Sequence, residues 1–232
     1  MARAPRPAEN GTPRKRARRP ATPPVGAEWG GRSRLWEGAL RQAGFERIAG
    51  IDEAGRGALA GPVVAAAVIL PTDFPEDGID DSKRLTPEQR ERAYERILAG
   101  AVAVGVGAVS NDEIDRINIF EATKRAMAQA VSALQPAPEF LLTDAVVLPL
   151  ALPLWALIKG DRRALPISAA SIVAKVTRDR LMTEFDRSYP HYAFAVHKGY
   201  STPEHLSRLK TFGACAIHRQ SFRPVAAPFR HA

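Results

Sequence analysis

Short apolar runs alternate with amphipathic segments along most of this chain. Runs rich in Val, Ala and Leu predict strands at residues 47–52, 62–70, 101–109, 140–143 and 154–158. Apolar residues at helical spacing, some of them flanked by Pro or Gly at the segment ends, predict helices at residues 33–44, 87–98, 120–134, 167–187 and 203–212.

The order of these elements predicts an α/β fold. The first strands follow one another closely, whereas the later ones alternate with helices, which is typical of a mixed sheet flanked by helices. A helical segment is expected to end the fold. Asp52, Asp144 and Asp161 each end or follow a strand-like run. They can therefore converge at one edge of the sheet.

Residues 1–30 differ from the rest of the chain. They are rich in Pro, Arg, Ala and Gly, and they include the basic run Arg14–Arg19. Because so little apolar surface cannot offset the entropy of the chain, we predict a disordered basic tail there. The basic run indicates a solvated tail, non-specific attraction to phosphates or a targeting signal. A folded domain is expected at 31–225 and a short C-terminal tail at 226–232.

Charge favours a polyanionic partner such as nucleic acid, because the formal net charge is +8. The single cysteine, Cys215, excludes an intramolecular disulfide and any multi-cysteine zinc site, and we expect it to be a small buried residue. A reducing, cytoplasmic location fits this composition. No apolar run reaches about 18 residues, so no membrane span is expected. The sequence does not fix the oligomeric state, and our expectation is a monomer.

Candidate chemistry is concentrated at residues 51–57. Asp52 and Glu53 end an apolar run, and Gly55-Arg56-Gly57 follows. Buried carboxylates are costly unless a metal or another partner holds them, and oxygen ligands suit hard cations such as Mg²⁺ or Mn²⁺. A Gly-Arg-Gly turn lets backbone N–H groups approach a phosphate or a sugar closely. This stretch therefore predicts metal-assisted chemistry on a polyanion.

The adjacent acids pose a geometric problem. Consecutive strand residues face opposite sides of a sheet, so Asp52 and Glu53 can share a site only if the strand bends there. Ala54-Gly55 makes such a bend easy. Taken singly, each acid is more commonly a solvated loop carboxylate. The joint placement of the acids favours a site.

Several motifs occur together along residues 47–225, and they are Asp52-Glu53-Ala54-Gly55-Arg56-Gly57 with Gly61-Pro62, Asp81-Ser82-Lys83, Ile117-Asn118-Ile119, Lys159-Gly160-Asp161, the stretch 168–179, His197-Lys198-Gly199-Tyr200 and His218-Arg219-Gln220-Ser221-Phe222. In this order and spacing the chain closely resembles type 2 ribonuclease H, the bacterial ribonuclease HII family. The resemblance implies a ribonuclease H-like fold and an endonuclease. Such enzymes cut the RNA strand of RNA–DNA hybrids and nick on the 5′ side of ribonucleotides embedded in duplex DNA. The products carry 3′-hydroxyl and 5′-phosphate ends.

The resemblance also implies roles for individual residues. Asp52, Glu53, Asp144 and Asp161 match the four acids that bind metal in the family. Two divalent cations, Mg²⁺ or Mn²⁺, are expected in the substrate complex, bridging the scissile phosphate.

Substrate recognition is implied for five further residues. Gly55, Arg56 and Gly57 match the turn that reads the ribose 2′-hydroxyl, and Tyr200 matches the tyrosine at the RNA–DNA junction. Lys83, in a polar turn before a helix, is our candidate for a phosphate contact.

Other motif residues remain open between two interpretations. Lys175 and Arg178 fit either a phosphate contact or the polar stripe of the long helix. His197 and His218 lack paired ligands at metal spacing, so packing or hydrogen bonding is expected of them rather than zinc binding. Ala145 departs from the family, which often has Gly after the third acid, and the backbone there is expected to differ slightly.

Two rival functions are compatible with the same motifs. One is a type 3-like hybrid nuclease that does not nick at single ribonucleotides, against which Arg56 and Tyr200 argue. The other is a non-catalytic hybrid-binding protein. All four acids are present, and a mere binder gains nothing from negative charge near phosphates.

Overall fold

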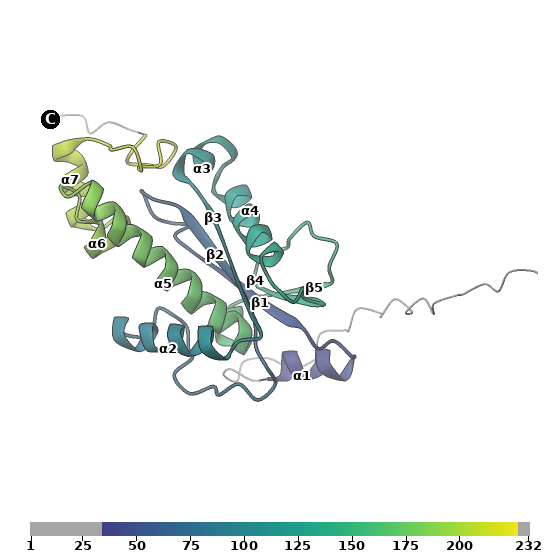
Figure 1. Ribbon diagram of the computed structural model, residues 1–232. Coiled ribbons are helices and arrows are strands. Elements are labelled where there is room, and N and C mark those ends of the chain that lie inside the picture. Colours follow the sequence, from purple (N-terminus) through teal and green to yellow (C-terminus); the bar gives the residue numbers. More distant parts are fainter. Residues whose placement is uncertain (1–33, 227–232) are drawn as a thin grey trace, which may run out of the picture.

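In residues 34–226, which the computed structural model describes, five strands form one mixed sheet in the order β3-β2-β1-β4-β5 (Figure 1). β1 pairs antiparallel with β2 and parallel with β4, while β2–β3 is antiparallel and β4–β5 parallel. The strands are β1 (Ile48–Ala54), β2 (Val63–Ile69), β3 (Ala103–Val109), β4 (Phe140–Asp144) and β5 (Leu154–Leu157). The α/β sheet expected from the sequence is confirmed. The predicted tail at 1–30, and residues 227–232 of the predicted C-terminal tail, lie outside the described residues.

Helices cover both faces of the sheet (Figure 1). They are α1 (Leu35–Gln42), α2 (Pro87–Gly100), α3 (Asn111–Ile117), α4 (Ile119–Ser132), the short 3-10 turn η1 (Gly160–Arg162), α5 (Leu165–Ser188), α6 (Phe194–His197) and α7 (Pro203–Phe212). Helix α4 packs on β2 and β3, and the long α5 packs on β1 and β2. Within residues 34–226 none of these helices has the length and apolar character that crossing a bilayer requires.

Two separate cores follow from the alternation of side chains along β1 and β2. Ala49 and Ile51 belong to the core under α4, whereas Ala54 belongs to the core under α5 and α2. Asp52 lies two residues before Ala54 on the same strand, so its side chain is on the same face of the sheet, the one covered by α5. The helix comes close because Gly50 has no side chain: a Cβ there would lie 2.0 Å from the carbonyl carbon of Pro166.

Short helices are the main difference from the sequence prediction. Helix α3 is only seven residues long, and Ser110 caps it by accepting a hydrogen bond from the Glu113 N–H. Asn118 then adopts φ 67° and caps α4. The single predicted helix at 120–134 is thus preceded by a separate turn of helix that was missed, as was the four-residue α6.

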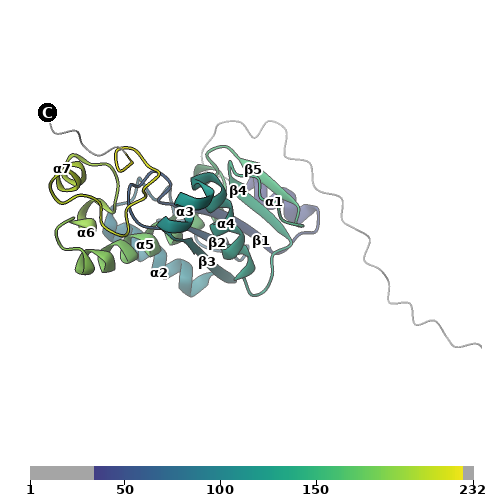
Figure 2. The same cartoon turned by 90° about the horizontal axis from the view of Figure 1, so that it is seen from above.

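The C-terminal segment lies at one end of the sheet. Figure 2 shows α6 and α7 beside the end of α5, opposite the end that carries β5 and α1. Backbone contacts hold this segment to the loop after β1, including an isolated bridge between Ala60 and His218. The predicted C-terminal helical segment is confirmed.

Candidate active site

Three acids from separate elements meet at one point of the structure. Asp52 lies on β1, Asp144 ends β4, and Asp161 lies in η1. One carboxylate oxygen of each lies within 4.8 Å of the others, the only such group of potential metal ligands in residues 34–226. The convergence predicted from the sequence is confirmed for these three.

The parallel pairing of β1 and β4 explains this convergence. Ile51 is in register with Thr143, so the next residue on each strand is an aspartate at the same level. The Gly160 N–H donates to Asp144 Oδ1 at 2.7 Å, which ties the 3-10 turn to the end of β4. The Ser168 hydroxyl donates to the Asp161 carbonyl at 2.6 Å and fixes that turn to α5.

Burial and like charge raise the pKa values of Asp52 and Asp161. Asp52 is 6% exposed and Asp161 is 5% exposed. Burial raises the pKa of Asp52 well above its ordinary range, and the carboxylates of Glu53 and Asp144 raise it further. Burial also raises the pKa of Asp161, again with a contribution from Asp144. The positive charges of Lys83 and Arg162 oppose these effects at Asp161 without cancelling them.

The structure does not bring Glu53 into the cluster of three. Strand β1 keeps a regular register with β2 through Ala54, and the Glu53 carboxylate lies close enough to raise the pKa of Asp52 without joining the group of three. Glu53 Oε1 instead accepts a hydrogen bond from Arg56 Nη1 at 3.1 Å. Its other oxygen, Oε2, is buried and has no partner among the described residues. Asp144 is close enough to raise the pKa of Glu53, although burial is the larger cause.

The donor set fits a hard divalent cation. All the ligands offered are carboxylate oxygens, the class that Mg²⁺ and Mn²⁺ prefer. A cation would add to the positive charge that Lys83 places beside these crowded acids, and the unpartnered Glu53 Oε2 offers one further ligand atom.

The Asp81-Ser82-Lys83 turn supports the acidic cluster from the side of α2. Asp81 is 1% exposed, and its Oδ2 accepts from Nε and Nη2 of Arg162 at 3.1 and 3.0 Å, so it anchors the residue after Asp161. These bonds and that of the Lys83 N–H lower the pKa of Asp81 against the opposing effect of burial. The Lys83 side chain is 79% exposed, with Nζ 3.9 Å from Asp161 Oδ2.

Ser171 links the same turn to β1. Its hydroxyl lies 3.0 Å from that of Ser82, and it also contributes a hydrogen bond that lowers the pKa of Asp52. Helix α5 thus contacts two of the three clustered acids, through Ser168 and Ser171.

Ala145 keeps the left-handed backbone that the family's glycine would allow. Its φ is 54°, so alanine itself occupies a region that is strained for a residue with a Cβ. The Ala145 N–H donates to the Leu157 carbonyl at 3.0 Å, which holds the turn in place.

The Gly-Arg-Gly turn and Tyr200 lie on neighbouring loops. The Leu59 N–H donates to the Gly199 carbonyl at 2.8 Å, so the loop after β1 touches the residue before Tyr200. Arg56 and Gly57 are exposed, whereas Gly55 is buried with φ 94°. Tyr200 is half-buried, and its ring centroid lies 5.2 Å from Arg178 Cζ.

The sequence interpretation left Arg178 open between two roles and gave Arg219 no role of its own. Arg178 is fully buried, so it does not belong to the polar stripe of α5, and Arg219 is fully buried too. Both lie inside the quoted motifs, which was the signal available. Lys175 does fit the polar stripe, because its Nζ donates to Asp179 Oδ1 at 2.7 Å.

The histidines form a packed cluster, as expected. His205 Nε2 lies 3.1 Å from His218 Nε2, and the rings of His197 and His205 stack at 4.3 Å. Burial lowers the pKa of His205 and of His218 to about 4, so both are neutral at physiological pH. Cys215 is only half-buried, with Sγ 3.1 Å from His218 Nδ1.

Comparison with known proteins agrees with this site. The sequence profile of the family described as Ribonuclease HII matches residues 49–225. A curated Ribonuclease HII from Geobacillus thermodenitrificans is 62% identical over 190 residues, which is 82% of this chain and 73% of that protein.

Solved structures share the fold. The ribonuclease H2 from Pyrococcus horikoshii OT3 matches with a TM-score of 0.67 and 28% identity, over 78% of this chain and 95% of that one. A ribonuclease HIII solved in complex with Mn²⁺, Bst-RNase HIII, matches with a TM-score of 0.61 and 19% identity, over 80% and 70%. The second likeness concerns the fold alone. On the family profile and the curated relatives, the chain belongs to the ribonuclease HII family of endoribonucleases.

Proposed function

We propose that this protein hydrolyses the RNA strand of RNA–DNA hybrids and nicks duplex DNA on the 5′ side of embedded ribonucleotides, leaving 3′-hydroxyl and 5′-phosphate ends. The observation that carries the proposal is the approach of Asp52, Asp144 and Asp161 to within 4.8 Å of one another. Membership of the ribonuclease HII family supports the choice of substrate.

Asp52, Glu53, Asp144 and Asp161 are the proposed ligands of two divalent cations, Mg²⁺ or Mn²⁺. When bound, such cations activate a water molecule and stabilise negative charge on the phosphate and on the leaving oxygen. The protein's part is to hold the carboxylates in place before substrate arrives. The Gly160 N–H holds the Asp144 carboxylate, and the Ser168 hydroxyl holds the main chain at Asp161.

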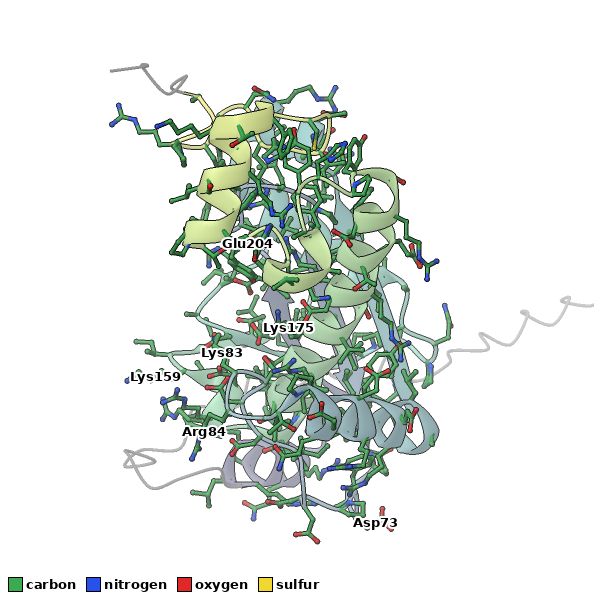
Figure 3. The ribbon with its side chains drawn as sticks, turned by 90° about the vertical axis from the view of Figure 1, so that its left-hand side faces the viewer. Asp73, Lys83, Arg84, Lys159, Lys175 and Glu204 are labelled. Atoms are coloured by element: carbon green, nitrogen blue, oxygen red, sulfur yellow. The ribbon has the colours of Figure 1, made fainter. Side chains whose placement is uncertain are left out.

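Lys83 is proposed to contact a phosphate of the substrate. Its side chain is largely exposed, yet its backbone N–H is fixed by Asp81 Oδ1 at 3.0 Å. Figure 3 shows Lys83 and Lys159 projecting from the same flank of the molecule, with Lys175 above them. A polyanionic substrate must approach the negative charge of the acids. Positive side chains beside the acids favour that approach.

Gly55, Arg56 and Gly57 are proposed to read the ribose 2′-hydroxyl. That hydroxyl marks RNA at the sugar, and it both donates and accepts hydrogen bonds. Neither the Arg56 nor the Gly57 N–H has a partner among the described residues, so both are free to donate. Tyr200, on the adjoining loop, is proposed to stack on the deoxyribose that follows the ribonucleotide.

The test is cleavage of a labelled DNA duplex that carries one ribonucleotide, with Mg²⁺, with Mn²⁺ and with EDTA. A single metal-dependent cut on the 5′ side of the ribonucleotide is expected. Cleavage of a continuous hybrid without this cut would favour the type 3-like specificity instead.

Asp52→Asn should abolish cleavage while leaving binding of the duplex measurable, because it removes a ligand and not the binding surface. The matched control is Asp73→Asn, an exposed aspartate in the loop after β2 that Figure 3 shows at the far end of the molecule. Cleavage that persists in Asp52→Asn would overturn the assignment.

A further inference from the structure

Two buried arginines lie beneath the Gly55-Arg56-Gly57 turn. Arg178 and Arg219 are both fully buried, and neither has a carboxylate within ion-pair distance in the described part of the chain. Burial lowers the pKa of Arg219 to about 9, with a further contribution from the charge of Arg178. Burying two guanidinium groups close together is costly, so the contacts that they make are informative.

All six of their side-chain hydrogen bonds go to backbone carbonyls. Arg219 donates to Gly55, Arg56 and Gly61 at 2.7, 2.9 and 3.0 Å. Arg178 donates to Pro62, Lys198 and Ala60 at 2.9, 2.9 and 3.1 Å. Five of these carbonyls belong to the loop at 55–62, which we call the ribose loop. The sixth belongs to the loop that carries Tyr200.

Arg219 fixes the direction of two peptide groups. In a trans peptide the C=O of one residue points opposite to the N–H of the next. The carbonyls of Gly55 and Arg56 point inward to Arg219, so the N–H groups of Arg56 and Gly57 point outward. These are the same two N–H groups that lack a partner among residues 34–226.

Arg178 joins the ribose loop to the Tyr200 loop. It reaches the carbonyls of Ala60 and Lys198 from one guanidinium, and its Cζ lies 5.2 Å from the Tyr200 ring centroid. The guanidinium also packs directly on Gly55, where a Cβ would lie 2.0 Å from Arg178 Nε. Gly55 is therefore required twice, by its φ of 94° and by this contact.

We propose that Arg219 and Arg178 are positioning residues for ribonucleotide recognition. Arg219 aims the Arg56 and Gly57 N–H groups at the ribose, and Arg178 sets the spacing between that turn and Tyr200. This inference rests on the proposed function, because it explains how the ribose loop reads its substrate. Neither arginine touches the substrate itself.

The first experiment measures dissociation constants in EDTA for two DNA duplexes that differ only in one 2′-hydroxyl. Wild-type protein should prefer the ribonucleotide duplex. In Arg219→Lys the charge stays, but one amine cannot replace three directed donors. The preference should fall by about tenfold, the equivalent of about 1.4 kcal/mol, while affinity for plain DNA changes little. The matched control is Arg208→Lys, at a partly exposed arginine that contacts Glu204 and His191 instead.

The outcomes separate this inference from the function that it rests on. Equal binding of both duplexes by the wild type would end the ribose-reading role and the positioning role together. A discriminating wild type with an equally discriminating, folded Arg219→Lys would end the positioning role alone. A general loss of stability would weaken binding of both duplexes alike and leave their ratio unchanged.

A second measurement uses the wild-type protein, so it does not depend on the folding of a variant. The amide NMR signals of Arg56 and Gly57 should shift with the ribonucleotide duplex and stay near their free positions with plain DNA. Equal shifts with both duplexes would overturn the proposal that Arg219 positions these two N–H groups for the ribose.

The role of Arg178 is tested by coupling it to Tyr200. Tyr200→Ala should reduce nicking at a single ribonucleotide more than cleavage of a long hybrid. In an Arg178→Lys background the same change should have a smaller effect, because the tyrosine is already misplaced. Additive effects of the two substitutions would show that Arg178 does not act through Tyr200.

Discussion

At the scale of single residues, the site holds backbone strain next to its chemistry. Ala145 follows Asp144 with φ 54°, a region that costs a residue with a Cβ roughly 1 to 2 kcal/mol. The Thr143 hydroxyl donates to the Val146 carbonyl at 2.5 Å and closes the turn around Ala145. The turn at Asp144 is therefore kept by its neighbours and not by the preference of residue 145.

Ala145→Gly should stabilise the protein by about 1 kcal/mol, because glycine adopts this φ without strain and loses only part of the gain to chain entropy. Chemical denaturation measures the change. Ala133→Gly is the control, since Ala133 is also exposed but has φ −81°, and there a loss of stability is expected. A destabilised Ala145→Gly would show that the strain is not relieved by removing the Cβ.

Glu37 is the second residue with an unusual environment. Its Oε1 accepts from the Leu165 N–H at 3.1 Å at the start of α5, while its Oε2 is buried without a partner among residues 34–226. Burial raises the pKa of Glu37 from 4.5 to about 7. The folded state thus binds a proton more tightly than the unfolded chain does.

The sign of the pH effect follows from this shift. The contribution of Glu37 is fully present below about pH 4.5 and is lost as the pH rises through about 7. Glu37→Gln should remove a slope of at most about 1.4 kcal/mol per pH unit from the free energy of unfolding in that window. Denaturation at several pH values measures it, with the exposed Glu46→Gln as control. An unchanged slope in Glu37→Gln would mean that this carboxyl is not what titrates.

The clustered acids and the buried arginines differ in how far the sequence reveals them. Asp52, Asp144 and Asp161 were predictable because each ends or follows an apolar run, and sheet geometry brings such ends together. Arg178 was not, since a basic residue on a helix has the same sequence signal whether it faces solvent or carbonyls. The position of Glu53 outside the group of three depends on how β1 pairs with β2 through Ala54, which local sequence did not decide.

At the scale of elements, glycines set how closely the helices approach the sheet. A Cβ at Gly107 on β3 would lie 2.2 Å from the Ala126 carbonyl oxygen of α4. A Cβ at Gly38, inside α1, would meet nothing within 4 Å. The same substitution therefore has opposite consequences at the two positions.

Gly107→Ala should destabilise the protein by about 1 to 3 kcal/mol or more, because α4 must move away from the sheet. Gly38→Ala should stabilise it by up to about 1 kcal/mol through helix propensity. Thermal unfolding compares the pair. A Gly107→Ala protein as stable as wild type would mean that the α4–sheet contact yields easily.

Helices and strands were predicted correctly where the hydrophobic pattern extends over enough residues to show a period. The predicted helix at 167–187 is α5 (Leu165–Ser188), and all five strands were placed to within a few residues. The seven residues of α3 and the four of α6 are too short to show a period, and capping side chains define α3 instead.

At the scale of the whole molecule, the net charge of +8 attracts a polyanionic substrate although the site itself is acidic. The basic run Arg14–Arg19 carries five of the positive charges.

Deleting residues 1–30 should reduce the slope of log affinity against log salt by about 0.9 for each phosphate that these residues neutralise. The position of the cut should not change, because the described site does not include these residues. Titrations of one duplex at several salt concentrations, followed by mapping of the cut, test both statements. A displaced cut would show that these residues also direct the substrate.

The contact between Arg219 and the ribose loop bears on how the protein is made. A ribosome delivers Asp52, Asp144 and Asp161 well before it delivers Tyr200 and Arg219. A chain ended by a premature stop after α5 would keep every acid of the cluster and Arg178, but it would lose Tyr200 and Arg219, the residue that holds the carbonyls of Gly55 and Arg56. Under the proposed roles of Arg219 and Tyr200, the residues for ribonucleotide selectivity are therefore translated after all the acids of the cluster.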